Sequence, residues 1–278
     1  MLRFLSLSSG SCGNCYYLSD GKSGILIDAG VSLRRLKRIL MEYGLGLDSF
    51  QAILVTHDHL DHIRHLGSYC KHLRKPVYTT HSLRIALLNH TFTMDYIGGY
   101  CSELPEDTPF RIPLGADVPE GECPVVSCFT VPHDATQTVG YFIEWGGRRF
   151  FLMTDAGRVT DEALSLAGRA DAVVIESNYD PGMLIGGPYT HELKMRICQG
   201  NGHLSNDECA SAITVFWHQG LKHIFLCHLS ENNNTPALAF SAAADALRSI
   251  PAGGGLSAKE VTCLQTLPRS TPSAMYEL

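Results

Sequence analysis

The stretch His57-Asp58-His59-Leu60-Asp61-His62 decides the fold, and it follows the apolar run Ala52–Val55 after a single threonine. A continuous apolar run rich in β-branched residues is typical of a strand covered on both faces, as in a layered α/β fold. Three imidazoles and two carboxylates within six residues serve no packing purpose there, and these groups bind zinc, manganese and iron. We therefore interpret the stretch as a metal-binding loop. His57 and His59 would share one ion, while Asp61 and His62 turn toward a second.

One loop cannot complete two metal sites, so further ligands are expected at the ends of other strands. His133 in VPHDA, Asp155 in LMTDAG and His228 in FLCHLS each follow an apolar, strand-like run. In layered α/β folds, binding sites form at the edge where such strands open into loops. We expect these three side chains to lie beside the loop at residues 57–62.

Strand-like and helix-like patterns alternate along the rest of the chain. Apolar runs predict strands at residues 2–7, 15–18, 24–28, 52–55, 77–80, 125–131, 139–144, 148–153, 172–176 and 223–227. Helical spacing predicts helices at 33–40, at 63–73, after a capping box at Ser205 and Glu208, and at 236–247. Gly146-Gly147 favours a hairpin turn, and residues 94–124 carry no clear pattern. This order predicts an α/β (α+β) sandwich of two sheets with helices on both outer faces, formed by a single domain over residues 1–278.

The composition predicts a cytoplasmic protein with reduced thiols. The opening MLRFLSLSSGSC lacks the long apolar core of a secretory signal, and no run approaches the ~20 apolar residues of a membrane-spanning helix. The ten cysteines are scattered, several of them in apolar runs such as those around Cys128, Cys227 and Cys263, so we expect small buried thiols. Cys12 and Cys15 form a CxxC pair that no second pair completes. Only the Gly253–Gly255 run and the polar C-terminal tail are expected to lack order.

The net charge of −6 argues against a general affinity for DNA, since non-specific binding depends on cations that neutralise phosphates. Any contact with nucleic acid must then come from local basic faces. Two helix faces and one short segment offer such cations: Arg34, Arg35 and Arg38; Arg64, Lys71, Arg74 and Lys75; and Lys194 with Arg196. Tyr179 and Tyr189 are candidates for stacking on a base. The simpler interpretation of the Arg34–Arg38 face is a solvated helix surface.

The HxHxDH stretch, the isolated His133 and Asp155, and the late His228 together resemble the ordered motifs of the metallo-β-lactamase superfamily. The resemblance implies a four-layer αββα sandwich and a hydrolase with two divalent metal ions, either zinc or manganese, with iron as a further option. It implies that His57, His59 and His133 hold one ion, that Asp61, His62 and His228 hold the other, and that Asp155 bridges them.

His203 needs a separate role. The order GHLS, helix, strand and LCHLS is similar to that of the tRNA-3′-processing branch of the superfamily, in which the earlier histidine assists catalysis and the later one binds metal. By that resemblance His203 is a proton donor or phosphate contact, and it joins Asp61 and Asp155 as a catalytic residue. Ser205 caps the following helix, so His203 is not needed as its cap. Asp58 is a candidate to orient a ligand imidazole, and Glu208 is a candidate to steady His203, although its place in the capping box alone would explain Glu208.

A narrower resemblance is to the YycJ (WalJ/VicX-like) branch. It is carried by SSGSCGNCYYL, LIDAG, ILVTHDHLDH, VPHDA, TDAG and ESNYD, and above all by GHLSN paired with HLSENNNTP. Cys12 departs from the serine expected there. The resemblance implies a metal-dependent phosphodiester hydrolase, a DNA exonuclease that acts on duplex DNA from the 5′ end. Candidate substrate contacts are Asn178, Tyr179, Ser205 and Asn232.

Three other functions use the same residues. One is a hydrolase for a small substrate, either a cyclic phosphodiester or a thioester, which would need no basic groove. Another is a metal-binding redox or regulatory protein, because a fold does not determine a function. The lack of a fused flavin domain argues only against the di-iron oxidoreductases among these. A penicillin-type lactamase is disfavoured, since those enzymes often have a cysteine in the second metal site and Asp155 stands at the bridging position here.

Overall fold

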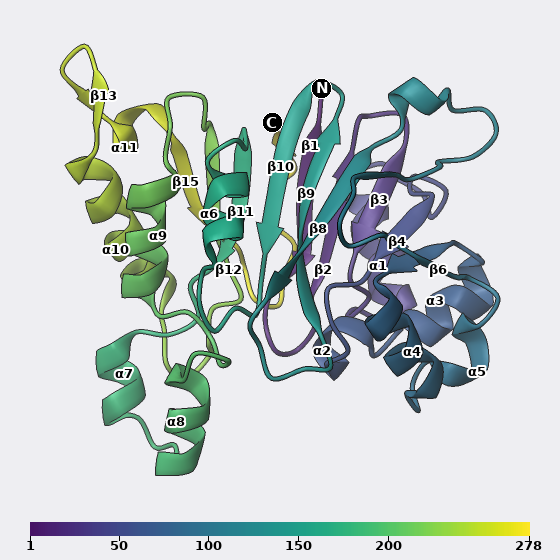
Figure 1. Ribbon diagram of the computed structural model, residues 1–278, viewed down its shortest axis with the longest axis horizontal. Coiled ribbons are helices and arrows are strands. Elements are labelled where there is room, and N and C mark those ends of the chain that lie inside the picture. The colour runs from purple at the N-terminus through teal and green to yellow at the C-terminus, as the bar shows by residue number, and fades with distance from the viewer.

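Two mixed β-sheets pack face to face in the computed structural model, which describes residues 1–278 (Figure 1). The first sheet contains, in spatial order, β16 (Tyr276–Glu277), β1 (Arg3–Ser8), β2 (Cys15–Ser19), β3 (Gly24–Ile27), β4 (Ala52–Leu54), β5 (Val77–Thr79) and β6 (Cys101–Glu103). The second contains β15 (Cys263–Thr266), β12 (His223–Cys227), β11 (Ala172–Glu176), β10 (Arg148–Met153), β9 (Thr138–Trp145), β8 (Val125–Val131) and β7 (Phe110–Arg111).

Helices cover the outer face of each sheet. The first sheet is covered by α1 (Leu33–Glu42), α3 (Leu66–Leu73), α4 (His81–Asn89) and α5 (Met94–Ile97). The second is covered by α6 (Asp161–Ala167), α9 (Asn206–Phe216), α10 (Pro236–Ser249) and α11 (Ala258–Val261). The short α2 (Leu60–Ile63) lies at the lower end of the sandwich in Figure 1. Helices α7 (Pro181–Gly186) and α8 (His191–Cys198) project below the second sheet and its helices. A 3₁₀ turn, Glu120–Glu122, and a small hairpin of β13 (Pro251–Gly253) and β14 (Leu256–Ser257) complete the chain.

The alternation of side chains along the strands explains the four layers. In β11, Ala172 and Val174 belong to the core between the two sheets, while Val173 and Ile175 belong to the core under α6, α9 and α10. Successive side chains of a strand point to opposite faces, so a strand that is apolar at every position needs a cover on both sides. The αββα fold expected from the sequence is therefore confirmed.

The strand directions bring several strand ends to one edge of the sandwich. Strands β10, β11 and β12 are parallel, and β8 runs in the same direction because it is antiparallel to β9, which is antiparallel to β10. Their carboxyl ends open into the loops that carry His133, Asp155, Glu176 and His228, and the carboxyl end of β4 in the facing sheet opens into residues 56–62. The topology thus gathers the predicted ligands at one end of the molecule.

The helix predicted over residues 63–73 is divided in two, which corrects the expectation from the sequence. The break comes at His65, whose backbone φ of −110° and ψ of 3° are not helical. The reason is tertiary, because the backbone N–H of His65 donates to the carbonyl of Ala29 at 3.1 Å. That bond ties the end of α2 to the segment following β3 and leaves α3 to begin at Leu66.

The C-terminal tail is folded, which contradicts the expected lack of order. The backbone N–H groups of Ser273 and Leu278 donate to the carbonyls of Ser6 and Leu2, each at 2.8 Å, so the tail covers the edge of β1. Arg35 contributes too, because its Nη2 donates to the carbonyl of Ser270 at 2.7 Å, so this residue does not belong to a freely solvated basic face. The Gly253–Gly255 run is folded as well, since Gly253 pairs with Leu256 in the β13–β14 hairpin and all three glycines have the positive φ that the turn requires.

All ten cysteines are free thiols, and six of them are buried: Cys15, Cys70, Cys123, Cys128, Cys209 and Cys227. Cys263 is exposed, contrary to the expectation, and Cys12 is exposed while Cys15 is buried. No helix has both the length and the apolar character needed to cross a bilayer.

Candidate metal centre

The first group of converging side chains is His57, His59 and His133. Their ligand atoms lie within 4.8 Å of one another, although His133 comes from the far sheet. Nδ1 of His133 donates to the carbonyl of Gly202 at 2.8 Å, which leaves its Nε2 with a free lone pair. Nε2 of His57 and Nε2 of His133 are both buried and have no hydrogen-bond partner. Buried polar atoms are rarely left unpartnered, and these two fit a metal ion between them.

The second group is Asp61, His62 and His228, whose ligand atoms also lie within 4.8 Å of one another. Oδ2 of Asp61 lies 3.5 Å from Nε2 of His62 and 3.5 Å from Nε2 of His228. Nε2 of His228 is buried and has no hydrogen-bond partner. A carboxylate facing two imidazoles is a donor set that suits a divalent transition metal.

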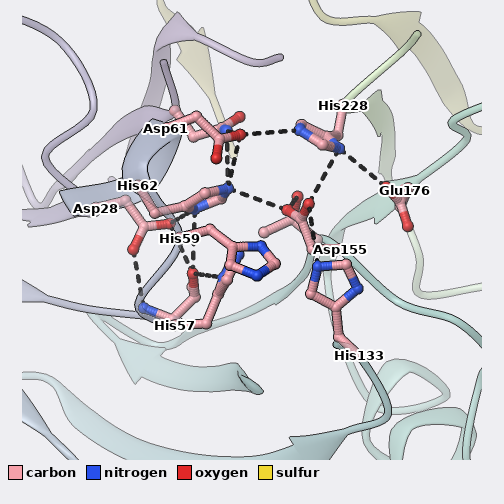
Figure 2. A network of polar contacts seen from close by, with 12 residues as sticks. Asp28, His57, His59, Asp61, His62, His133, Asp155, Glu176 and His228 are labelled. Atoms are coloured by element: carbon pink, nitrogen blue, oxygen red, sulfur yellow. Dashed lines mark hydrogen bonds and ion pairs between the residues drawn. The ribbon is translucent and has the colours of Figure 1, made fainter. Parts of the chain in front are cut away.

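Asp155 lies between the two groups (Figure 2). Its Oδ2 lies 3.1 Å from Nε2 of His62, and its Oδ1 lies 3.3 Å from Nδ1 of His228 and 3.9 Å from Nε2 of His133. The structure therefore brings together all seven predicted ligands, which come from the ends of β4, β8, β10 and β12. The carboxylate thus has neighbours in both groups, His62 and His228 in the second and His133 in the first, as a bridging position between two ions would require.

The backbone is strained at the same place. Asp155 and His228 each have a φ of 52°, and Asp28 has a φ of 63°. Non-glycine residues in the left-handed region cost about 1–3 kcal/mol each and persist where the surrounding structure holds them, which is common at functional sites. Here the strain turns side chains at three strand ends into the cluster.

Asp28 orients His62, a role that the sequence analysis gave to Asp58. Oδ2 of Asp28 accepts from Nδ1 of His62 at 2.7 Å, and Oδ1 accepts from the backbone N–H of Thr56 at 2.8 Å. The expectation for Asp58 is wrong, because its carboxylate accepts from the backbone N–H and the hydroxyl of Thr136 instead. A carboxylate on the far nitrogen of a ligating histidine fixes its tautomer and makes it a better ligand.

Glu176 holds His203, a role that we expected of Glu208. Oε1 of Glu176 accepts from Nδ1 of His203 at 2.8 Å and from Nδ1 of His228 at 3.0 Å. Glu208 is occupied elsewhere, since its carboxylate accepts from the backbone N–H and hydroxyl of Ser205 in the capping box of α9. Glu176 is fully buried and directly connects the proposed proton donor with a proposed metal ligand.

Most of the proposed substrate contacts have structural partners. Asn178 is nearly buried, and its Nδ2 donates to the carbonyl of His228 at 2.8 Å. Ser205 is the N-cap of α9, and Nδ2 of Asn232 donates to the hydroxyl of Tyr189 at 2.8 Å. Tyr179 lines a separate apolar cleft between α7 and α8.

Charge at the site follows from burial and from neighbours. Burial, with help from the nearby His62, holds the pKa of His57 well below its usual range, and burial also lowers the pKa of His133. Both imidazoles are therefore neutral at neutral pH, as metal ligands must be. Burial alone would raise the pKa of Asp155, but the imidazoles of His228 and His62 hold it well below its usual range.

The cluster forms the floor of an open pocket of about 200 Å³. Its lining includes His59, Asp61, His133, Asp155, His203 and His228, and its only hydrophobic residues are Leu193 and Ile197 of α8. Ser11, from the turn between β1 and β2, and the Arg196–Asp134 ion pair complete the wall. The lining is suited to a charged substrate with many oxygen atoms.

Sequence reasoning missed three polar residues that contact the cluster: Asn14, Asp28 and Glu176. Nδ2 of Asn14 lies 3.1 Å from Oδ2 of Asp61 and 2.8 Å from Nε2 of His62. Asp28 follows the apolar run of β3, and Glu176 ends that of β11. The placement at a strand end that identified His133, Asp155 and His228 would also have identified these two carboxylates.

Residues 24–222 match the family described as the beta-lactamase superfamily domain. Exodeoxyribonuclease YycJ of Bacillus anthracis is 34% identical over 238 residues, which is 86% of each chain. Exodeoxyribonuclease WalJ of Streptococcus pneumoniae strain D39 is 31% identical over 257 residues, or 92% of each chain. The crystal structure of Zn²⁺-bound PqqB from Methylobacterium extorquens has the same fold, with a TM-score of 0.67 and 17% identity over 98% of this chain and 99% of that one.

Proposed function

The chain belongs to the beta-lactamase superfamily, in the group that includes the exodeoxyribonucleases YycJ and WalJ, and on that premise we propose that it is a metal-dependent exodeoxyribonuclease that degrades duplex DNA from the 5′ end. The fold and the cluster of histidines and carboxylates are those of a metal-dependent hydrolase. The DNA substrate and the direction of cleavage are the parts that we propose.

The observation that carries the proposal is the convergence of ligand atoms at the floor of a polar pocket. His57, His133 and His228 each present a buried, unpartnered Nε2 there. By this geometry His57, His59 and His133 would hold one divalent ion, and Asp61, His62 and His228 a second, with Asp155 between them. When bound, such ions lower the pKa of water and neutralise charge on phosphate oxygens. We propose zinc or manganese, because both accept imidazole and carboxylate ligands.

The chain itself supplies the proton donor in this proposal. Burial alone would lower the pKa of His203, but the carboxylate of Glu176 at 2.8 Å raises it above the ordinary value for histidine. His203 lines the pocket, so the protonated imidazole that Glu176 favours faces the substrate and can donate to the leaving oxygen. General acid catalysis of this kind contributes about 10²- to 10⁴-fold in rate.

Fixed polar contacts keep these groups in place. Asp28 fixes the ring of His62 through Nδ1, and Gly202 fixes the ring of His133 in the same way. The carboxylate of Asp134 accepts from Arg196 at 2.5 Å and lies 3.4 Å from Nε2 of His133, which ties α8 to the rim of the pocket. A rigid set of ligands loses little entropy when substrate and metal bind, because the groups are ordered in advance.

A nuclease assay tests the proposed function. Duplex and single-stranded DNA and RNA, labelled at the 5′ or the 3′ end, are incubated with the protein and zinc or manganese. We expect release of the 5′ label from duplex DNA as mononucleotides or short products, dependent on added metal. Cleavage of bis(p-nitrophenyl) phosphate without cleavage of any polynucleotide would favour the small-phosphodiester alternative.

A further inference from the structure

Helix α8, which comprises His191–Cys198, forms a wall between two pockets. Leu193, Arg196 and Ile197 line the metal pocket. His191, Lys194, Met195 and Cys198 line a second cleft, on the opposite face of the helix. Residues three and four apart share a face of an α-helix, so these two sets follow from the helical repeat. None of the eight residues of α8 is buried.

An eight-residue helix is marginal in isolation, and helices usually depend on packing of one apolar face. Helix α8 instead leaves Leu193 and Met195 37% and 38% exposed, and Ile185 at the end of the neighbouring α7 is 76% exposed. Apolar side chains gathered in this way beside a functional site are typical of a binding surface.

The second cleft lies between α7 and α8 and has a volume of about 440 Å³. Leu184, Ile185 and Met195 make it largely apolar, and Tyr179 supplies an aromatic wall. Lys194 and His191 also line the cleft, so the Lys194 cation stands beside an apolar interior, where its Nζ donates to the carbonyl of Ile185 at 2.7 Å. Two adjacent residues connect this cleft with the metal centre. Tyr179 lines the cleft, and Nδ2 of the preceding Asn178 donates to the carbonyl of His228 at 2.8 Å.

We propose that the cleft between α7 and α8 binds an unpaired nucleobase of the DNA strand whose phosphate lies in the metal pocket. Proteins that bind single strands combine aromatic or apolar surface for the bases with cations for the backbone, and this cleft has both. The helix between the two pockets is about 10–12 Å across, so the base belongs to a nucleotide next to the one cleaved rather than to that nucleotide itself. This inference rests on the proposed nuclease function.

The proposal explains how a duplex can reach the metal centre. The metal pocket has a volume of about 200 Å³, and in this proposal the end of the duplex opens so that a single strand brings its phosphate to the pocket floor. Unpairing and unstacking cost a few kcal/mol per base. A cleft that accepts the released base offsets that cost and holds the strand in place.

A cycle of variants and abasic substrates tests the inference. The double variant Ile185→Ser with Met195→Ser removes apolar surface from exposed side chains, and Leu238→Ser on α10, where the side chain is 40% exposed, is the matched control. We expect the double variant to raise the KM for a DNA substrate by about 5- to 150-fold, as loss of one stacked base would. The control should keep the wild-type KM.

The substrate arm places an abasic site at each of the first nucleotides in turn. For wild type, one position should raise the KM by a similar factor, and at that position the double variant should show no further loss. Equal KM values for the double variant and wild type, or losses that add at every position, would overturn the base-binding cleft. If the wild-type protein cleaves DNA but this test fails, only the base-binding cleft is overturned. If the wild-type protein cleaves no polynucleotide, the proposed nuclease function is overturned as well.

Occupancy of the cleft has a second readout that does not depend on cleavage. Cys198 is exposed and lines the cleft, whereas the other exposed cysteines, Cys12 and Cys263, do not line it. In a Cys12→Ser, Cys263→Ser background, a phosphorothioate oligonucleotide should slow alkylation of Cys198, and an abasic oligonucleotide of equal length should slow it less. Equal alkylation rates with both oligonucleotides would contradict the inference, because backbone binding alone would then explain the protection.

Discussion

Nδ1 of His203 lies 2.8 Å from Oε1 of Glu176, and this carboxylate is fully buried at the end of β11. The same oxygen lies 3.0 Å from Nδ1 of His228, so Glu176 connects the proposed proton donor with a proposed metal ligand. The carboxylate raises the pKa of His203, which burial alone would lower, and this leads to a prediction about pH.

Replacing Glu176 with glutamine should move the alkaline limb of the pH–rate profile to lower pH. The contact with Glu176 raises the pKa of His203 and so favours the protonated imidazole, and without the carboxylate burial lowers that pKa again. A general acid acts only while protonated, so kcat/KM should fall at a lower pH in Glu176→Gln than in wild type. Metal content is measured in parallel, and an unchanged limb with intact metal content would exclude His203 as the acid.

His203→Ala should keep its metal but lose about 10²- to 10⁴-fold in kcat. The ligand atom of His203 lies within 4.8 Å of those of Asp155, Glu176 and His228, but its Nδ1 is taken up by the hydrogen bond to Glu176, and we assign it to neither proposed group of three. The matched comparison is His57→Ala, which removes a buried ligand and should lose metal as well as activity. A fall in the metal content of His203→Ala as large as in His57→Ala would show that our division of roles is wrong.

Asp28→Asn should weaken metal binding by about 10- to 100-fold, as expected for loss of the carboxylate that orients a ligating histidine. The contact at risk is the 2.7 Å bond between Oδ2 of Asp28 and Nδ1 of His62. Asp58→Asn is the control, because Asp58 contacts Thr136 rather than an imidazole. Titration with a competing chelator measures both affinities, and similar losses in the two variants would refute the orienting role of Asp28.

Asp171→Asn should destabilise the metal-free protein by about 1 kcal/mol at neutral pH. Asp171 accepts from the backbone N–H of Arg149 at 2.8 Å and from its guanidinium at 3.2 Å. Burial raises the pKa of Asp171, but these hydrogen bonds outweigh it and leave the pKa below the ordinary value. A lowered folded-state pKa contributes stability above the unfolded value and loses it in acid, so urea midpoints of wild type and variant should converge only below about pH 4. A constant difference down to pH 3 would mean that the charge of Asp171 is not involved.

Strands buried on both faces were the best predicted elements. The strands at 125–131, 148–153, 172–176 and 223–227 match the prediction at both ends, because each contains a run of apolar residues that pack against both neighbouring layers. Helix α8 could not be predicted in this way, since a helix with no buried residue has no apolar stripe. The break at His65 and the order of the tail depend on contacts with Ala29 and β1, which no local pattern contains.

At the site, the strand-end rule brought together His133, Asp155 and His228 as expected, although their roles as metal ligands stay predictions. The orienting carboxylates were predicted wrongly, because Asp58 and Glu208 are close to the histidines in the chain but contact other groups in the fold. The structure uses Asp28 and Glu176 from other strands instead. Their position at strand ends marks both carboxylates as candidates, but which imidazole each one contacts depends on how the strands pair across a sheet.

Anomalous diffraction from crystals grown with manganese or zinc tests the central claim most directly. We predict two peaks, one in contact with His57, His59 and His133, the other in contact with Asp61, His62 and His228, and both in contact with Asp155. A saturated crystal with no peak among these residues, or with its ions bound elsewhere on the chain, would contradict the proposed metal centre and the hydrolytic function built on it.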